Sequence, residues 1–415
     1  MKKVLIIGAS ILQLPAIRKA KELGYYVGVA DYNPEAIGIP YADEYFNVST
    51  IDIEGVVEIA KRFKPDGIMT LATDMPMRAV AAACKELGLP GISPDTALKA
   101  TDKAEMIKAF EAHGVEHPWY YVVSDRSVFD SIIQQASYPC IMKPTDNAGS
   151  RGVVLCHDKS ELIKGYEYAS HESRGGAVII EEYLQGPEFS VEVMVVNEVP
   201  HVLQITDKIT TGTPHFVEMG HTQPTSQPQA VQEKIKDLAC RAVKAVGINV
   251  GPAHVEMILT AHGPKMVELG ARMGGDCITT HLVPLSTGID MVAATIKLAC
   301  GEIVDTESRR SKGAAIRYFK TKPGILKRIE GIEKAKNIPG VIEISFVQGI
   351  GDTVGEIGSS TDRIGFVIAQ AETRQQAIGI CEQVIKSIEI DVADVEYEIS
   401  EAYRKNHCIL YGNYY

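Results

Sequence analysis

The chain has 415 residues, with 42 basic against 53 acidic side chains and a net charge of −11. This length allows about two to four domains with an ample core. The acidic balance, without a block of Lys or Arg, argues against a nucleic-acid-binding surface and favours an enzyme of small molecules. The N-terminal apolar run stops at Gly8 and no later run reaches about 18 apolar residues, so we expect no signal peptide, no membrane partner and a cytoplasmic location.

The cysteines are scattered through the chain without a Cys-x-x-Cys pair. Their spacing argues against a zinc site and against a disulfide framework. We therefore expect reduced, mostly buried thiols.

The N-terminal region predicts a βαβ unit that continues as alternating strands and helices of a Rossmann-like, parallel-sheet domain. The first turn reads Gly-Ala-Ser-Ile-Leu-Gln and lacks the second and third glycines of a dinucleotide site. NAD binding, with Asp31 on the ribose, is therefore a minor alternative. The expected strands are 4–7, 26–30, 67–71 and a short one at 89–92, and the expected helices are 14–23, 55–63 and 77–87.

Asp74 comes just after the expected strand 67–71. Open α/β sheets bind ligands at the carboxyl ends of their strands, so Asp74 is a candidate substrate residue. An equally good explanation is that Asp74 caps the next helix.

Two lysines and a small-residue loop follow. Lys103 lies in a polar helical stretch that starts at Ser93, where an ordinary exposed lysine is the alternative. Lys143 ends a buried strand that starts near Pro139, an unusual place for a charge. The loop from Thr145 to Val153 is rich in small residues whose free amides could cradle phosphates. It is not a Walker A loop, because no Gly-Lys-Ser/Thr follows.

The segment 178–184 predicts an apolar strand that runs into Glu181, Glu182, Tyr183 and Leu184, and a second strand is expected over 190–196. Between them lies Gly-Pro-Glu188. Such a strand-to-turn segment can offer backbone groups to an adenine edge and carboxylates to its amine and to ribose hydroxyls. A plain hairpin corner is the alternative.

The stretch 254–276 predicts a hairpin whose strands, 254–259 and 265–269, alternate polar and apolar residues. Glu256 and Glu268 are expected on one face. Two inward carboxylates repel each other, and a hard divalent cation such as Mg²⁺ is the simplest compensation. Arg272, set among glycines that include Gly274 and Gly275, would add a fixed guanidinium suited to a phosphoryl or acyl-phosphate group. A solvated hairpin is the alternative.

Taken together, these motifs resemble the ATP-grasp ligases over roughly residues 1–390. The resemblance implies an α/β and α+β multidomain protein with the ATP-grasp fold, an N-terminal Rossmann-like parallel-sheet domain and a C-terminal mixed β-rich domain. The implied boundaries are 1–105, 106–305 with a lid near 115–180, 306–395, and a tail at 396–415. The motifs are Thr-Asp-Lys103, Met-Lys143-Pro, the small-residue loop, Glu-Glu-Tyr-Leu-x-Gly-Pro-Glu188, His-Val-Glu256 and Val-Glu268-Leu-Gly-Ala-Arg272-Met-Gly-Gly.

The resemblance also implies roles. Lys103 and Lys143 contact the ATP phosphates, Glu256 and Glu268 carry Mg²⁺ or Mn²⁺, and Arg272 steadies an acyl phosphate, with Lys143 and Arg272 as the catalytic pair. Many relatives have Asn where this chain has Gly270, which leaves open how a second Mg²⁺ is held. The implied nucleotide-binding residues are Lys103, Lys143, Asn147, Gly149, Ser150, Arg151, Gly152, Glu181, Glu182, Tyr183, Leu184 and Glu188.

The region from Gly313 resembles the closing domain of biotin carboxylase, glycinamide ribonucleotide synthetase and especially the L-amino acid ligases. We therefore expect a small carboxylate and an amine as substrates, with a homodimer as one arrangement. Biotin carboxylation is disfavoured because no biotin-carrier segment follows. Further candidate substrate residues are His215, Glu218, His221, Gly274, Gly275 and Arg317, and a zinc site at His215, Glu218 and His221 is the alternative for that loop.

The resemblance implies a ligase that activates the carboxylate as an acyl phosphate, which the amine displaces with release of ADP and phosphate. A carboxylase or carbamoyl-phosphate-type enzyme using bicarbonate, and a non-catalytic ATP-binding module, are the two alternatives. Dependence on both a carboxylate and an amine separates the first from the others.

Overall fold

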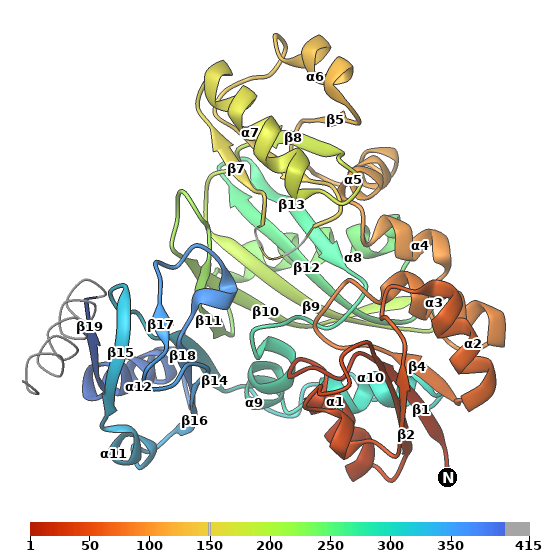
Figure 1. Ribbon diagram of the computed structural model, residues 1–415, viewed down its shortest axis with the longest axis vertical. Helices are drawn as coiled ribbons and strands as arrows, with labels where there is room; N and C mark the ends of the chain where they lie inside the picture. Colours follow the sequence, from red (N-terminus) through yellow and green to blue (C-terminus); the bar gives the residue numbers. More distant parts are fainter. Residues whose placement is uncertain (148, 150, 395–415) are drawn as a thin grey trace, which may run out of the picture. The chain divides into compact units, whose positions relative to one another are not determined.

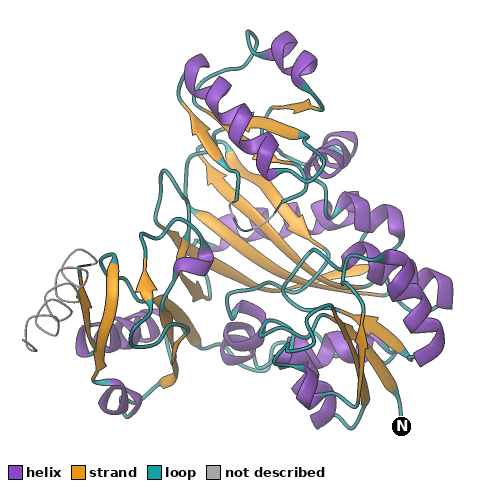
Figure 2. Cartoon of the chain, viewed as in Figure 1, coloured by secondary structure: helices purple, strands orange, loops and turns teal. Residues whose placement is uncertain are grey.

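The computed structural model describes residues 1–147, 149 and 151–394 (Figure 1). Two compact units divide the chain: residues 1–209 with 222–312, and residues 210–221 with the chain from Gly313 onward. Parallel and antiparallel sheets with helices between them confirm the predicted α/β and α+β class (Figure 2). Ser150 and the expected tail at 396–415 lie outside the described residues.

The first sheet of the larger unit is parallel, in the order β3-β2-β1-β4, as the βαβ pattern predicts. Helix α2 packs on α3, and α1 packs on α10. The elements are β1 (Lys3–Ile7), α1 (Leu14–Glu22), β2 (Tyr26–Asp31), β3 (Glu44–Asn47), α2 (Ile53–Phe63), β4 (Gly67–Met69), α3 (Met77–Leu87) and α10 (Met291–Ala299), with a short 3-10 turn at Ile39–Tyr41.

The turn after β1 is closed by the chain's own side chains. Asp31 accepts hydrogen bonds from the N–H groups of Ala9 (2.8 Å) and Asn33 (2.9 Å). Gly8 has φ +102°, and a Cβ there would lie 2.8 Å from Oε1 of Gln13. Because Asp31 already accepts hydrogen bonds from backbone groups and Gln13 fills the space beside Gly8, this turn does not support the NAD alternative.

The strand expected at 89–92 does not form. Pro90 removes a backbone donor, and the segment leads directly into α4 (Pro94–Lys99), for which Ser93 is the N-cap. The next helix, α5 (Lys103–Ala112), is capped by Asp102, which accepts hydrogen bonds from the N–H groups of Ala104 and Glu105.

An antiparallel sheet in the order β5-β8-β6-β7 forms a small layer with its own core. Helix α7 packs on β6 and β7, and the rings of Phe129 and Tyr166 stack 4.2 Å apart within that core. The elements are β5 (Tyr120–Val123), α6 (Arg126–Ile132), β6 (Cys140–Pro144), β7 (Val154–Cys156), α7 (Lys159–Glu172) and β8 (Val178–Glu182).

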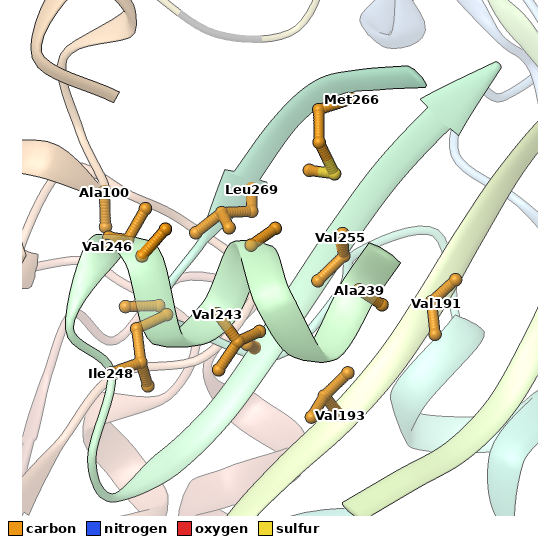
Figure 3. Close-up of a cluster of buried hydrophobic side chains, with 14 of the residues drawn as sticks. Ala100, Val191, Val193, Ala239, Val243, Val246, Ile248, Val255, Met266 and Leu269 are labelled. Atoms are coloured by element: carbon orange, nitrogen blue, oxygen red, sulfur yellow. The ribbon is translucent and has the colours of Figure 1, made fainter. Parts of the chain in front are cut away.

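Four long antiparallel strands, β13-β12-β9-β10, make the central sheet of the larger unit. Helix α8 lies on one face, where Val243 and Val246 from the helix and Val191 and Val255 from the strands belong to one cluster of buried apolar side chains (Figure 3). The opposite face is left for polar residues. The elements are β9 (Glu188–Val196), β10 (Val199–Thr210), α8 (Gln229–Val246), β12 (Gly251–Thr260) and β13 (Gly263–Gly270).

After β13 the chain forms a π-turn at Ile278–Leu282 and α9 (Val283–Thr287) before α10. Among the described residues, no single helix has the length and apolar character of a membrane span. Only the helical run 278–287 taken together with α10 passes such a test, and these two are bent by 112°.

The smaller unit contains strands in the order β11-β14-β18-β16 and a second sheet, β17-β15-β19. Helix α12 packs on β14 and β18. The elements are β11 (Glu218–Gln223), β14 (Gly313–Tyr318), β15 (Gly324–Glu330), α11 (Ile332–Lys336), β16 (Val341–Phe346), β17 (Thr353–Val354), a 3-10 turn (Ser360–Asp362), β18 (Gly365–Ala371), α12 (Arg374–Ser387) and β19 (Glu389–Ala393).

The cysteines in the described part of the chain are free, and Cys84, Cys140, Cys156, Cys300 and Cys381 are buried. The expectation of mostly buried cysteines is confirmed for the described residues, and their reduced state stays a prediction.

Candidate active site

Glu256 on β12 and Glu268 on β13 are direct partners across the antiparallel pair, so their side chains share one face, as the alternating pattern predicted. Each carboxylate has a lysine beside it. Lys103 Nζ lies 3.0 Å from Glu268 Oε2, and Lys208 Nζ lies 3.3 Å from Glu256 Oε2. The repulsion between the two acids is thus offset by cations from α5 and β10.

Lys103 is fixed by the chain around it. Its N–H donates to Thr145 O (2.8 Å), and its Nζ donates to Asn147 O (2.7 Å). Burial opposes the charge of the ammonium, but the negative charge of Glu268 and its hydrogen bond outweigh this and raise the pKa of Lys103. Lys103 is therefore a permanent cation that ties the start of the small-residue loop to the carboxylate face.

Lys143 lies on β6 and Glu181 on the neighbouring β8, with their Nζ and Oε2 atoms 2.6 Å apart. Only 13% and 5% of these two side chains are exposed. The strand-end lysine and the first acid of the expected adenine segment therefore form one buried ion pair.

The rest of the expected adenine segment follows β8. Glu182 pairs with Lys265 Nζ (2.7 Å), and Leu184 is buried. Tyr183 is half-buried. Gly186 has φ +146°, and a Cβ there would lie 2.0 Å from Leu259 O, so only glycine lets this segment approach β12 so closely.

Lys208 is a site residue that the sequence did not reveal. Its side chain is 2% exposed, and its Nζ lies 2.6 Å from Glu188 Oε1 as well as near Glu256. Lys208 thus joins the expected ribose carboxylate to an expected metal carboxylate. The only sequence signal is a buried-type strand interrupted by Thr-Asp-Lys.

His254 bridges two acids. Its Nδ1 lies 2.6 Å from Glu192 Oε1, and its Nε2 lies 3.0 Å from Glu256 Oε1. Burial favours a neutral ring, but the charge of Glu192 and the hydrogen bonds to both acids prevail and raise the pKa of His254 to about 9. Burial likewise opposes ionisation of Glu256, yet Lys208, His254 and Arg272 lower its pKa well below the usual value. The site therefore holds Glu256 as a carboxylate.

Gly274 and Gly275 differ in what surrounds them. A Cβ on Gly274 would lie 2.6 Å from His254 Nδ1, so this glycine makes room for the Glu192–His254 pair. A Cβ on Gly275 would meet nothing within 4 Å, so this position borders open space.

Arg272 and Asp74 form a two-pronged ion pair, with Nε to Oδ1 and Nη2 to Oδ2 both 2.9 Å. Burial disfavours the charge of Arg272, but the negative charge of Asp74 and its hydrogen bonds dominate and raise the pKa of the guanidinium. The N-cap of α3 is Pro76, so the side chain of Asp74 does not serve as the alternative helix cap.

The small-residue loop joins β6 to β7 through glycines in left-handed conformations, Gly149 (φ +68°) and Gly152 (φ +79°). A Cβ on Gly152 would lie 2.5 Å from Cγ of Pro144. Asn147 Nδ2 donates to Glu172 O at 3.1 Å, and Arg151 is exposed.

The other expected substrate residues, His215, Glu218, His221 and Arg317, belong to the smaller unit. Glu218 and His221 lie on β11 and not in an open loop. His215 is exposed, whereas His221 is buried and its carbonyl accepts a hydrogen bond from Arg317 Nη1 (3.0 Å). Among the described residues no group of three or more His, Cys, Asp or Glu side chains is placed to hold a metal ion, so the zinc alternative has no support.

Comparison with protein families now identifies the fold and the chemistry. Residues 136–280 match the ATP-grasp domain, and residues 317–393 match the L-amino acid ligase C-terminal domain 2. The chain therefore contains an ATP-grasp domain, followed by an L-amino acid ligase C-terminal domain. The first match contains Lys143, Glu181, Lys208, Glu256 and Arg272, so most of the polar face described above lies in the domain that defines the superfamily.

The chain is similar to alanine–anticapsin ligase of Bacillus subtilis (strain 168), with 26% identity over 70% of this chain and 66% of that protein. It is also similar to the crystal structure of phosphoribosylglycinamide synthetase from Anaerococcus prevotii, with a TM-score of 0.76, 25% identity and coverage of 94% of this chain and 100% of that one.

The crystal structure of L-amino acid ligase from Bacillus licheniformis shares the fold of this chain. The TM-score is 0.83 at 21% identity, over 95% of this chain and 99% of that one. The predicted ATP-grasp fold and ATP-dependent carbon–nitrogen ligation are therefore confirmed.

ATP-grasp enzymes use ATP and Mg²⁺. The donor set fits such an ion, because two opposed carboxylates offer hard oxygen ligands while phosphates and water fill the remaining positions. Lys103 and Lys208 offset the charge of the same two carboxylates.

Proposed function

We propose that this chain activates the carboxylate of a small acid, an amino acid above all, as an acyl phosphate and joins it to the amine of a second small molecule. The observation that carries the proposal is the convergence of Lys103, Lys208 and Arg272 on the opposed pair Glu256 and Glu268. A cluster of fixed cations and dipoles is what phosphoryl transfer requires, since the reaction needs charge neutralisation and alignment more than a side-chain nucleophile.

In the proposed reaction, a carboxylate oxygen attacks the γ-phosphorus of ATP, and the bond to the β-phosphate oxygen breaks to release ADP. The amine nitrogen then attacks the acyl carbon, loses a proton and expels phosphate. Lys103 and Lys143 neutralise the phosphates, and Arg272 holds the acyl phosphate. Mg²⁺, or Mn²⁺, held by Glu256 and Glu268 would neutralise phosphate charge.

We assign the nucleotide to the face between β8 and the small-residue loop. Glu181, Glu182, Tyr183 and the backbone of Leu184 would hold adenine, and Glu188 the ribose. The buried pair of Lys143 with Glu181 supports this placement, because it fixes the phosphate lysine beside the adenine segment. Asn147, Gly149, Ser150, Arg151 and Gly152 would close over the phosphates.

Amino acids are the proposed substrates because the names of two similar proteins, alanine–anticapsin ligase and L-amino acid ligase, specify amino acids. We place the carboxylate donor beside Arg272 and Gly275. His215, Glu218, His221 and Arg317 remain proposed acceptor residues. The domain boundaries at 105, 305 and 395 also remain proposals.

The test is a phosphate-release screen over pairs of amino acids, with and without bicarbonate. Release that needs both a carboxylate and an amine supports the proposal. Release that needs bicarbonate would favour a carboxylase or carbamoyl-phosphate-type enzyme. ATP binding with no release under any condition would favour a non-catalytic module.

A further inference from the structure

Arg272 is the residue proposed to hold the acyl phosphate. Its guanidinium is hydrogen-bonded to the carboxylate of Asp74, which lies 198 residues earlier in the chain. Asp74 follows β4 in the parallel sheet, whereas Arg272 follows β13 in the central sheet. Both oxygens of Asp74 accept hydrogen bonds from Arg272 at 2.9 Å, and only 22% and 13% of the two side chains are exposed. Such a paired arrangement fixes the plane of the guanidinium as well as its position.

Position 270 lies directly against this pair. A Cβ added to Gly270 would lie 2.5 Å from Oδ1 of Asp74, 3.0 Å from Nε and 3.1 Å from Cζ of Arg272. Real Cβ atoms do not approach other atoms at 2.5 Å, and both neighbours are held by each other. A side chain at 270 and the Asp74–Arg272 pair therefore exclude one another. This gives a physical reason for the glycine at position 270.

The ion pair with Asp74 also determines which edge of the Arg272 guanidinium is left for a ligand. Asp74 takes the edge formed by Nε and Nη2, and Nη1 donates to Met273 O at 3.3 Å. The outer edge, between the two terminal nitrogens, is not the edge that Asp74 occupies. Two parallel hydrogens at that edge match two oxygens of a carboxylate or phosphoryl group.

We propose that Asp74 is a positioning residue for Arg272, and that position 270 is glycine because this pair fills the space that a side chain would need. The inference rests on the proposed function, because it takes Arg272 as the group that holds the acyl phosphate. It follows that position 270 offers no side chain beside Glu256 and Glu268. Mg²⁺ would then be held by Glu256 and Glu268 without a protein ligand from position 270.

The rival role for Asp74 is direct binding of a substrate ammonium. Against it, both oxygens of Asp74 already accept charge-assisted bonds from Arg272, and an ammonium would have to compete with a buried guanidinium for them. The two roles differ in kinetics. Loss of a positioning residue lowers kcat, whereas loss of a substrate ligand raises the KM of that substrate.

The first experiment is a double-mutant cycle with Gly270→Ala, Asp74→Ala and the double variant, read as thermal unfolding without substrate. Gly270→Ala alone should lower Tm by about 3 °C or more, because the methyl group forces the pair apart. In the Asp74→Ala background the same methyl should cost much less. Gly379→Ala, where a Cβ meets nothing within 4 Å, is the matched control and should leave Tm unchanged or higher. Equal costs of Gly270→Ala in both backgrounds would overturn the inference.

The second measurement is Mg²⁺-dependent ADP binding by calorimetry, with Gly270→Asn in the Asp74→Ala background. Asn at 270 can then reach the carboxylate face, and we expect tighter Mg²⁺-dependent binding than in Asp74→Ala alone. No gain would show that position 270 does not face the metal carboxylates and would overturn that part of the inference.

The third measurement is steady-state kinetics of Asp74→Asn. We expect kcat to fall about 100-fold, as for a misplaced catalytic group, with KM values nearly unchanged. A raised KM for the amine with normal kcat would make Asp74 a substrate ligand and refute the positioning role. Because the cycle and the calorimetry need no substrate, coupling between 74 and 270 without any ligase turnover would count against the proposed function and not against the pairing. Absence of coupling between positions 74 and 270 would count against the pairing and leave the proposed function standing.

Discussion

The buried carboxylate of Glu192 lies 2.6 Å from Nδ1 of His254, and the two residues are direct partners on β9 and β12. The other ring nitrogen of His254, Nε2, is hydrogen-bonded to Glu256, so the position of the ring also restricts the Glu256 carboxylate. A chain of three side chains, two of them almost wholly buried, thus fixes the orientation of a proposed metal ligand. This is the outer layer that metal-binding carboxylates commonly need.

The first prediction is that Glu192→Gln destabilises the fold by about 3 kcal/mol, because it leaves a buried imidazolium with only one of its two carboxylate partners. Urea unfolding measures the difference. Ser190→Ala is the control, since Ser190 lies on the same strand, is fully buried, and its Oγ has no hydrogen-bond partner among the described residues. That variant should change stability by no more than about 1 kcal/mol. Equal effects of the two variants would contradict the charged bridge.

The second prediction concerns Lys208, whose Nζ contacts Glu188 and Glu256. Lys208→Met should cost about 3 to 5 kcal/mol, because it removes a buried cation that faces two carboxylates. It should also weaken ADP binding, since Glu188 loses a cation that orients it. The matched control is Lys265→Met, which breaks a pair with Glu182 that is about one-third exposed and should cost no more than about 1 kcal/mol. A destabilisation of only about 1 kcal/mol by Lys208→Met would refute the claim that Lys208 stabilises the buried carboxylates.

Lys208 also marks the limit of what the sequence predicts. The hairpin at 254–270 could be predicted, because alternation along each strand is local and places Glu256 and Glu268 on one face. The role of Lys208 depends on neighbours from β9 and β12, and no local pattern reports which strands pair. Register across a sheet is set by the assembled core, not by the strand itself.

Asp74 and Arg272 show the same limit in another way. Each is a candidate from the sequence alone, but nothing in the sequence joins them, and Gly270 stands out as a departure without a cause. The pair supplies that cause. The strand expected at 89–92 was wrong because Pro90 and the cap at Ser93 outweigh a short apolar run.

The third prediction is that Glu268→Gln abolishes turnover far more than it weakens folding. The amide keeps the shape but cannot offset the charge of Mg²⁺, so the loss should exceed the roughly 100-fold seen for outer-layer partners of metal ligands. Mg²⁺-dependent ADP affinity and urea unfolding are measured together. Glu233→Gln, which disrupts an exposed pair with Lys236, serves as the control. Near-normal activity at saturating Mg²⁺ would disprove the metal assignment.

The fourth prediction is a pH dependence at Asp125, the N-cap of α6. Hydrogen bonds from the Ser127 hydroxyl, the Val128 N–H and the Ser124 hydroxyl lower the pKa of Asp125 to about 2. A lowered carboxyl pKa stabilises the fold above the unfolded value of about 3.9, and this contribution disappears as the pH falls through about 2. Asp125→Ser keeps a capping oxygen without a titrating group. The stability difference between the two proteins should therefore shrink between about pH 4 and pH 2, and a constant difference would contradict the assignment.

The last prediction concerns the chemistry itself. If a substrate carboxylate is activated as an acyl phosphate, ¹⁸O placed in that carboxylate must appear in the released phosphate, because the oxygen that attacks phosphorus leaves with it. Arg272→Lys should slow this transfer, since an ammonium keeps the charge but loses both the outer edge that can hold two oxygens and the two-pronged bond to Asp74. If label reaches phosphate from bicarbonate alone, the activated group is bicarbonate and not an amino acid, and the enzyme is a carboxylase. Label from neither source would exclude the acyl phosphate, and with it the proposed role of Arg272 in holding that group.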